Sequence, residues 1–325
     1  MASTYAEAME SETGAFLPRS PDAGTCARFR FRRMLVVLTG VGASFMLAIV
    51  AVPSASTLAA ALSRAIGLSG EKSPPWDYTS FHLGDWPEKY PLCGGKPDPR
   101  YSHNEFQSPI AIPSIDDKNV PHVGAPQFLA QDGGCHMADV ERNEHTLETS
   151  FNAANCTNLK ATFKGITYTL LQFHFHSLSE NKIKGRHTAA EMHMVHQSDD
   201  GRYLVIGMFL EGANRGPADN FLATVFKDGL EPGHEHEFKQ QPINPYTILR
   251  AGEPFYSFMG SFTTPPCTPD VQWLLLKKTH PVRAKYLTEF HFYLDNDADQ
   301  ADSYGNVYRP VQPINGREFE FGVLD

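Results

Sequence analysis

Two short segments in which polar and apolar residues alternate constrain the fold of this chain more than any other feature. Residues 171–176 read LQFHFH, and residues 190–196 read AEMHMVH. Successive side chains of a β-strand point to opposite faces, so the first segment is predicted to project Gln172, His174 and His176 from one face of a strand. A single His-x-His of this kind is more often a partly buried structural pair than a metal site.

The second segment adds a further histidine in the same way. As a strand, residues 190–196 place Glu191, His193 and Val195 on one face, whereas His196 points to the other face. Two neighbouring strands of this pattern can bring three imidazoles to a single point. His196 is therefore expected to be structural.

Three neutral imidazoles at about 2.0–2.1 Å suit zinc and leave a fourth tetrahedral position for water, which is the arrangement of a catalytic site. Gln172 precedes His174 by two residues, and Glu191 precedes His193 by two. Each is placed to accept the distal ring N–H and so to hold its imidazole in the tautomer that zinc requires. The sequence thus predicts one zinc ion bound by His174, His176 and His193.

His234 and His236 form a second His-x-His motif, but their surroundings differ. Pro232, Gly233 and three glutamates flank them. We expect a solvated loop there and no metal ligand.

The chain from residue 76 onward reads as short alternating strands separated by Gly, Pro and Asn clusters. The clearest strands are predicted over 161–171, 189–197 and 203–211, and one helix around 218–226. With 24 Pro, 25 Gly and 41% hydrophobic residues, the composition favours many turns around a substantial core. The predicted fold class is a single mainly β (α+β) domain with short peripheral helices.

A 19-residue apolar run, 34–52, is long enough to span a bilayer as a helix. Four arginines stand within residues 28–33, so the positive-inside rule keeps the tail 1–33 in the cytosol and exports the chain after about residue 53. Residues 53–75, rich in Ala, Ser and Pro, are predicted to be a linker to a catalytic domain over 76–325.

The apolar run is either a retained signal anchor or the h-region of a cleaved signal. The 33 residues before it and its length favour an anchor, giving a single-pass type II membrane protein with the domain extracellular or lumenal. Small residues at Ser54/Ser56 and Thr57/Ala59 offer cleavage sites, so a secreted protein is the alternative. A buried core helix is disfavoured because the run has no polar face at helical spacing.

The exported body is acidic. Of 28 Lys/Arg and 37 Asp/Glu in the chain, seven and five precede Trp76, which leaves 21 against 32 and a net charge of −11. Such a body repels nucleic acid and anionic membrane surfaces, so no nucleic-acid partner is expected.

These segments closely resemble the α-carbonic anhydrase family, over essentially residues 76–325. The blocks that carry the resemblance are Phe106–Ile110 (FQSPI), Leu171–Glu180 (LQFHFHSLSE), Ala190–His196 (AEMHMVH), Gly260–Pro266 (GSFTTPP) and Val307–Pro313 (VYRPVQP). The resemblance implies a large, mostly antiparallel, twisted central sheet. It also implies reversible hydration of carbon dioxide to bicarbonate and a proton by zinc-bound hydroxide, without an organic cofactor.

The resemblance assigns roles to residues beyond the three zinc histidines. Thr263 matches the hydroxyl that hydrogen-bonds the zinc-bound solvent, and Glu180 matches the carboxylate that accepts the Thr263 proton. A threonine obliged to donate to a carboxylate must accept from the solvent, which aims the solvent lone pair at the substrate. Thr264 is expected to line the polar side of the pocket.

His145, within NEHTLE at 143–148, matches the family's proton-shuttle position, while Asn143 and Tyr78 match positions that order the intervening water. From the sequence alone, a surface histidine explains His145 equally well. An imidazole with a pKa near 6.5 is suited to accept and discharge the proton released in each turnover.

The resemblance also implies an apolar wall for carbon dioxide, although each of its residues is also compatible with a purely core role. Its expected members are Val195, Val205, Phe262, Val271 and Trp273. Phe262 stands where the family commonly has leucine, and this larger side chain is expected to narrow the pocket and lower the turnover rate.

Four of the five cysteines follow the apolar run, which fits disulfides in an oxidising compartment. Cys93 and Cys267 match the disulfide pair of exported family members. Their loop of 174 residues gives about 5 kcal/mol as an upper estimate of stabilisation. Cys135 and Cys156 flank His145 almost symmetrically, so a second bridge across that hairpin is a hypothesis.

The rival interpretation is a carbonic-anhydrase-like binding or adhesion domain that lacks catalysis. Members of that kind usually lack one or more zinc histidines, whereas all three are present here. The expected partner is thus a small molecule, carbon dioxide or bicarbonate, with a membrane contact through the N-terminal helix. The sequence gives no indication of the oligomeric state.

Overall fold

The structure, a computed structural model, describes residues 76–142, 145–151, 156–226, 234–237, 242–295 and 306–325. The predicted tail 1–33, the apolar helix 34–52 and the linker 53–75 lie outside these residues. No helix within the described ranges is both long enough and apolar enough to cross a membrane.

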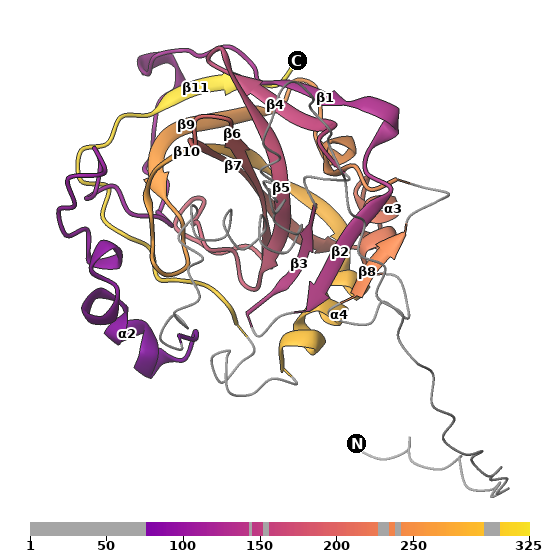
Figure 1. Ribbon diagram of the computed structural model, residues 1–325, viewed down its shortest axis with the longest axis horizontal. Helices are drawn as coiled ribbons and strands as arrows, with labels where there is room; N and C mark the ends of the chain where they lie inside the picture. Colours follow the sequence, from indigo (N-terminus) through magenta and orange to yellow (C-terminus); the bar gives the residue numbers. More distant parts are fainter. Residues whose placement is uncertain (1–75, 143–144, 152–155, 227–233, 238–241, 296–305) are drawn as a thin grey trace, which may run out of the picture. The chain divides into compact units, whose positions relative to one another are not determined.

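One twisted sheet of 11 strands forms the body of the domain (Figure 1). Its strands are β1 Gln127–Ala130, β2 Met137–Arg142, β3 Leu147–Ser150, β4 Leu159–Phe163, β5 Ile166–His176, β6 Ala190–Ser198, β7 Tyr203–Ala213, β8 His234–Glu237, β9 Pro254–Ser261, β10 Pro269–Arg283 and β11 Glu320–Val323. The main order is β11-β9-β10-β7-β6-β5-β3-β2-β8, with β4 beside β5 and β1 beside β4. Among these strands only β7 and β10 pair in parallel, which confirms the predicted mostly antiparallel sheet.

Short helices lie around the sheet rather than within it (Figure 1). They are α2 Ser80–Lys89, α3 Asp219–Val225, α4 Ala284–Asp295 and the 3-10 turns η1 Pro91–Gly94, η2 Asp117–Asn119, η3 Gln131–Gly133 and η4 Pro245–Ile248. The helix predicted around 218–226 is confirmed as α3. The fold is therefore mainly β, as predicted.

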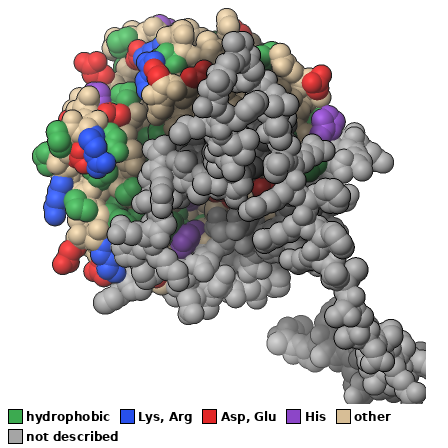
Figure 2. All heavy atoms as spheres, viewed as in Figure 1, with side chains coloured by type: hydrophobic (Ala, Val, Ile, Leu, Met, Phe, Trp, Pro, Cys, Tyr) green, Lys and Arg blue, Asp and Glu red, His purple; other side chains and the backbone are tan. Residues whose placement is uncertain are grey.

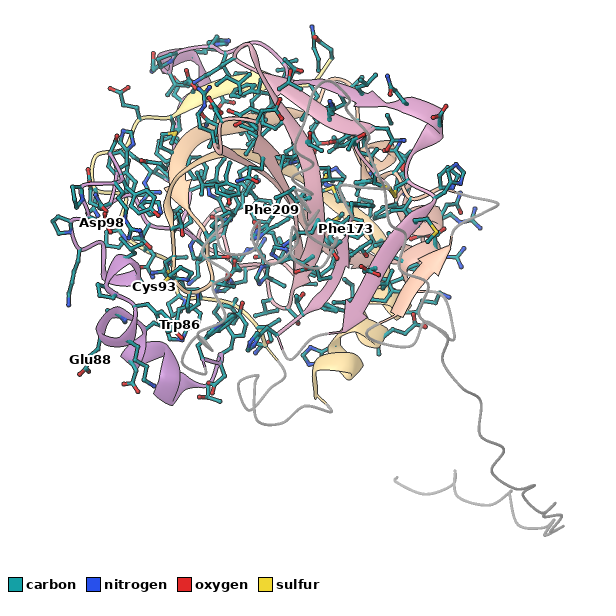
Figure 3. The ribbon with its side chains drawn as sticks, viewed as in Figure 1. Trp86, Glu88, Cys93, Asp98, Phe173 and Phe209 are labelled. Carbon is teal, nitrogen blue, oxygen red and sulfur yellow. A yellow bond between two sulfur atoms is a disulfide. The ribbon has the colours of Figure 1, made fainter. Side chains whose placement is uncertain are left out.

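The two faces of the central strands pack into two different hydrophobic clusters, because successive side chains alternate between them. On β6, Met192 and Met194 join the larger cluster, which contains Phe173 of β5. Val195 joins the smaller cluster, which contains Phe209 of β7. Phe173 and Phe209 are both fully buried and are labelled in Figure 3. The predicted metal-ligand face is the face of the smaller cluster.

The single strand predicted over 161–171 is in fact two strands of a hairpin. β4 ends at Phe163 and β5 begins at Ile166, with Lys164 and Gly165 between them at φ of 50° and 76°. Positive φ at both central residues is the geometry of the tight turns that best match strand twist. The apolar positions change from odd numbers, Ala161 and Phe163, to even numbers, Ile166, Tyr168 and Leu170, so the phase of the alternation shifts at this turn and marks the break between the two strands.

The loop predicted around His234 and His236 is also wrong. These residues form β8, which pairs antiparallel with β2. Backbone pairing with a neighbouring strand outweighs the local Gly and Pro signals here.

The surface carries both signs of charge. Figure 2 shows acidic and basic side chains interspersed among apolar ones on the coloured part of the visible face. On the coloured part of this face, the acidic side chains are not gathered in one patch (Figure 2).

Candidate metal centre

The three predicted ligands come together where β5 and β6 pair. His174 lies directly opposite His193 in the register of the two strands, and His176 lies opposite Glu191. One nitrogen from each of the three imidazoles lies within 4.8 Å of the other two. Among the described residues, no other group of three or more His, Cys, Asp or Glu side chains forms a comparable metal-binding set.

Each imidazole is oriented by a hydrogen bond from its other nitrogen. His174 donates from Nδ1 to Gln172 Oε1 at 2.7 Å, and His193 donates from Nε2 to Glu191 Oε1 at 3.0 Å. His176 donates from Nδ1 to the backbone carbonyl of Val307 at 2.9 Å. The lone pairs that remain, on Nε2 of His174, Nδ1 of His193 and Nε2 of His176, face the common point.

These donors fit zinc in chemistry and in spacing. Burial lowers the pKa values of His174 and His176 well below the usual range, with a further lowering by the neighbouring His193, so both rings are neutral at pH 7. Their Nε2 atoms lie 3.1 Å apart. Nitrogens about 2.0–2.1 Å from a tetrahedral zinc are separated by about 3.3 Å, so this pair already has nearly the spacing that zinc requires.

Glu180 lies fully buried beside the three histidines. Its Oε1 accepts a hydrogen bond from the backbone N–H of Arg309 at 2.8 Å, and its Oε2 lies 3.3 Å from His176 Nε2. Burial raises the pKa of Glu180 to about 7, opposed by the charge of His193 and by hydrogen bonds from the Arg309 backbone and the Thr263 side chain. The Thr263 side chain thus lies close enough to Glu180 to favour the ionised carboxylate, and its hydroxyl is suited to donate to it.

Glu191 is itself held by a residue that sequence reasoning missed. Asn181 donates from its backbone to Glu191 Oε2 at 2.8 Å and from its side chain to Oε1 at 2.7 Å. Gly207 faces His193 across β6 and β7, and a Cβ there would lie 3.1 Å from Glu191 Oε1 and 2.7 Å from Leu275 Cδ1. A larger residue at position 207 would therefore require Leu275 or Glu191 to shift.

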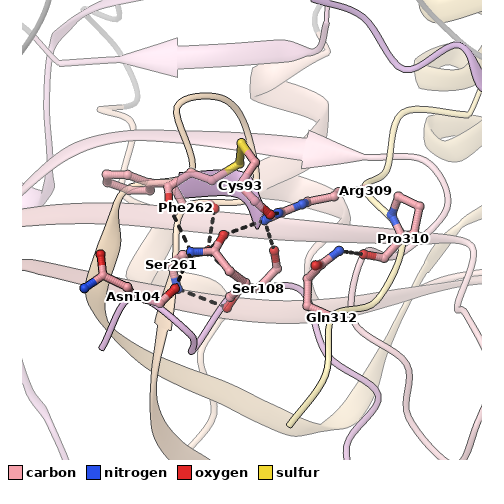
Figure 4. Close-up of a disulfide and its surroundings, with 10 residues drawn as sticks. Cys93, Asn104, Ser108, Ser261, Phe262, Arg309, Pro310 and Gln312 are labelled. Atoms are coloured by element: carbon pink, nitrogen blue, oxygen red, sulfur yellow. Dashed lines mark hydrogen bonds between the residues drawn. A yellow bond between two sulfur atoms is a disulfide. The ribbon is translucent and has the colours of Figure 1, made fainter. Parts of the chain in front are cut away.

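Arg309 fixes the segment that carries the Glu180 contact (Figure 4). Its buried guanidinium donates to the carbonyls of Cys93 and Ser108, both at 2.6 Å, and to Gln107 Oε1 at 3.1 Å. Ser261, next to the Thr263 loop, donates to the same Gln107 oxygen at 3.2 Å. The FQSPI and VYRPVQP blocks thus meet behind the metal centre.

Both disulfides are present. Cys93 is bonded to Cys267, 174 residues away, and Cys135 is bonded to Cys156, 21 residues away. Cys267 lies three residues after Thr264, so the first bridge ties the threonine loop to the N-terminal part of the domain.

A cavity of about 60 Å³ opens beside the histidines. It is lined by Gln172, His174, His193, Val195, Val205, Phe262, Thr263, Thr264 and Trp273. Val271 is not among the lining residues and is fully buried in the cluster beneath, so its place is in the core. The ring of Phe262 packs against that of Tyr203 at a centroid distance of 4.8 Å.

His145 lies in an aromatic setting at the start of β3. Its ring stacks on Trp76 at a centroid distance of 3.7 Å and an interplanar angle of 17°. The ring of Tyr78 lies 6.2 Å away, edge to face. Burial and the nearby Glu180 raise the pKa of Tyr78 well above its usual value, so its hydroxyl stays protonated. Asn143 lies outside the described residues.

Fold and site together define the class of protein. A β-sheet presents three imidazoles to one point, with an acceptor behind each ring and a small, partly apolar cavity at the open side. This is the construction of a mononuclear catalytic zinc enzyme rather than that of a closed structural site.

Comparison with known proteins gives the family. The profile of the eukaryotic-type carbonic anhydrases matches residues 82–321. Carbonic anhydrases of Pectobacterium atrosepticum and Neisseria gonorrhoeae are 33% and 31% identical to the chain, covering 80% and 74% of it and 96% and 86% of themselves. A hyperthermostable carbonic anhydrase from an active hydrothermal vent chimney matches with a TM-score of 0.60 at 26% identity, covering 77% of this chain and 100% of that one. The chain therefore belongs to the α-class carbonic anhydrases, enzymes that use zinc.

Proposed function

We propose that this domain catalyses the reversible hydration of carbon dioxide at the centre formed by His174, His176 and His193, and that His145 exports the proton. The observation that carries the proposal is the convergence of three imidazole lone pairs beside the Thr263–Glu180 pair. Zinc at this centre supplies Lewis-acid chemistry, which lowers the pKa of water from about 15.7 to about 7 and makes it a nucleophile at neutral pH.

The residues around the centre orient the reactants. A Thr263 hydroxyl that donates to ionised Glu180 can only accept from the attacking water, which would fix the direction of the water lone pair. Val195, Val205 and Trp273 line the cavity with apolar atoms suited to carbon dioxide and poor at holding water. Thr264 supplies a polar group on the same cavity wall.

His145 is proposed as the proton shuttle because its ring stands at the aromatic wall formed by Trp76 and Tyr78. The stacked Trp76 ring holds the imidazole in a defined position without adding a fixed charge. The protonated hydroxyl of Tyr78 is suited to order water between His145 and the centre.

The test is stopped-flow hydration of carbon dioxide by the purified protein, with zinc analysis and His193→Ala as control. Folded, zinc-loaded wild type should hydrate carbon dioxide far above background, and the variant should lose both zinc and activity. Zinc-loaded protein without activity would instead favour a binding domain.

His145→Ala tests the shuttle separately. It should lower the hydration rate mainly in dilute buffer and regain the rate with added imidazole, because an external base replaces the missing group. An unchanged rate in dilute buffer would remove His145 from the mechanism.

We further propose that the chain is a single-pass type II membrane protein with this domain extracellular or lumenal. The apolar run 34–52 and the two disulfides support this, since disulfides persist in oxidising compartments. Alkaline carbonate extraction should leave full-length chain in the membrane pellet. A shortened chain in the medium would identify the secreted alternative.

A further inference from the structure

A carboxylate on the neighbouring strand contacts the residue that orients His174. β3 and β5 pair antiparallel, with Glu148 opposite His174 and Ser150 opposite Gln172. Glu148 is thus diagonal to Gln172 on the metal-facing side, a separation that long side chains bridge. Gln172 Nε2 donates to Glu148 Oε2 at 3.3 Å while its Oε1 accepts from His174 Nδ1 at 2.7 Å.

Gln172 differs in kind from the other two groups that orient the zinc ligands. His176 is held by a backbone carbonyl and His193 by the carboxylate of Glu191, both of which only accept. An amide carries both an acceptor and a donor at almost the same positions, and a half-turn exchanges them. Of the three orienting groups, only the amide has a direction that must be set from outside.

Glu148 sets that direction. An ionised carboxylate has no donor, so it takes the amide NH2 and leaves the amide oxygen toward His174. The reversed amide would place its oxygen against the carboxylate and its NH2 against Nδ1. His174 would then have to accept at Nδ1 and carry its proton on Nε2, the atom that lies 3.1 Å from His176 Nε2 at the metal point.

We propose that Glu148 is a positioning residue of the zinc centre, which fixes the Gln172 amide and thereby the metal-binding tautomer of His174. This inference rests on zinc binding at the three histidines and deepens the proposed function. The contact that carries the inference is the one between Glu148 and the Gln172 amide, so the proposed effect on His174 passes through Gln172.

The experiment compares Glu148→Met, similar in length but without a strong acceptor, with Glu148→Gln, which can rotate to accept. Glu211→Met, an exposed glutamate on β7, is the matched control for the same change elsewhere. Zinc affinity is measured by competition with a chelator. The His174 tautomer is read from imidazole ¹⁵N shifts of the metal-free protein.

Glu148→Met should lower the affinity for zinc about tenfold, which is the lower end of the loss seen when groups that orient metal ligands are removed. It should also populate the tautomer of His174 that carries the proton on Nε2. Glu148→Gln and Glu211→Met should stay within about threefold of wild type. Glu148→Lys, whose ammonium only donates, should lower the zinc affinity at least as much as Glu148→Met does. It replaces Glu148→Met in the test if that variant does not fold.

Equal zinc affinity in wild type and Glu148→Met, an unchanged His174 tautomer, or an equal loss in Glu211→Met would overturn the inference. Each of these leaves the proposed function intact if the wild type binds one zinc and hydrates carbon dioxide. A wild type that fails to bind zinc overturns the proposed function instead.

Discussion

The buried ring of His196 should make this domain lose stability in mild acid. It lies on β6, on the face opposite the zinc ligands, and is fully buried. Its Nδ1–H donates to the carbonyl of Met194 at 3.0 Å, and its Nε2 accepts from the Tyr246 hydroxyl at 2.9 Å. Burial lowers the pKa of His196 to about 4, although hydrogen bonds to the Leu204 and Met194 carbonyls oppose the shift.

The size of the effect follows from the difference between the folded and unfolded pKa values. An unfolded histidine titrates near 6.5, about 2.5 units higher, and each unit corresponds to about 1.36 kcal/mol. The fold therefore disfavours the charged ring relative to the neutral ring by about 3 kcal/mol. Between pH 6.5 and 4 the unfolded chain binds more protons, so stability is full above this window and falls as pH is lowered through it.

The assay is urea unfolding of metal-free wild type and of His196→Asn, which keeps a donor toward Met194 but does not titrate. From pH 7.5 to pH 4.5 the wild type should lose about 2.5 kcal/mol more unfolding free energy than the variant. Metal-free protein removes the loss of zinc from the comparison, and the other histidines are common to both chains. Parallel pH dependences of the two proteins would refute the argument.

Two further substitutions test the pocket and its support. Phe262→Leu should enlarge the cavity and raise kcat/KM several-fold for a bulky activated ester, but less for carbon dioxide, because the smaller substrate needs less room. Steady-state kinetics measure this, and an unchanged ratio of the two kcat/KM values would show that Phe262 does not limit access to the cavity. Arg309→Met should lower the unfolding free energy by at least about 3 kcal/mol, because three buried acceptors lose a charged donor, and Arg309→Lys should have an intermediate effect. Urea unfolding measures this free energy, and a loss of less than about 1 kcal/mol in Arg309→Met would contradict the argument.

Strand alternation was enough to predict the ligand set because the relevant information is local. Gln172, His174 and His176 share one face of β5, and His193 shares the facing position on β6. Side-chain direction follows the parity of the residue number along a regular strand, as it does in β5 after the irregularity between Leu170 and Gln172. The sheet needed only to pair the two segments in register.

The groups that alternation could not predict reach the centre from distant parts of the chain. Val307 contributes a backbone carbonyl, which leaves no trace in residue type. Asn181 stands beside Glu180 in the sequence, but its contact with Glu191 depends on how the connection between β5 and β6 folds back. The prediction that Val271 lines the apolar wall is wrong. Val271 lies in the core beneath the cavity, because the strand face of a residue does not determine how near it lies to the cavity.

The centre consequently depends on the C-terminal segment as much as on its own strands. His176 takes its orienting carbonyl from Val307, 131 residues away, and Glu180 takes its hydrogen bond from Arg309, 129 residues away. Arg309 in turn holds the carbonyls of Cys93 and Ser108 from the N-terminal part of the domain. Pairing β5 with β6 brings the three imidazoles together, but the orientation of His176 and the placement of Glu180 require both ends of the domain to be in place. Zinc affinity should therefore report on folding of the whole domain, and not only on formation of this hairpin.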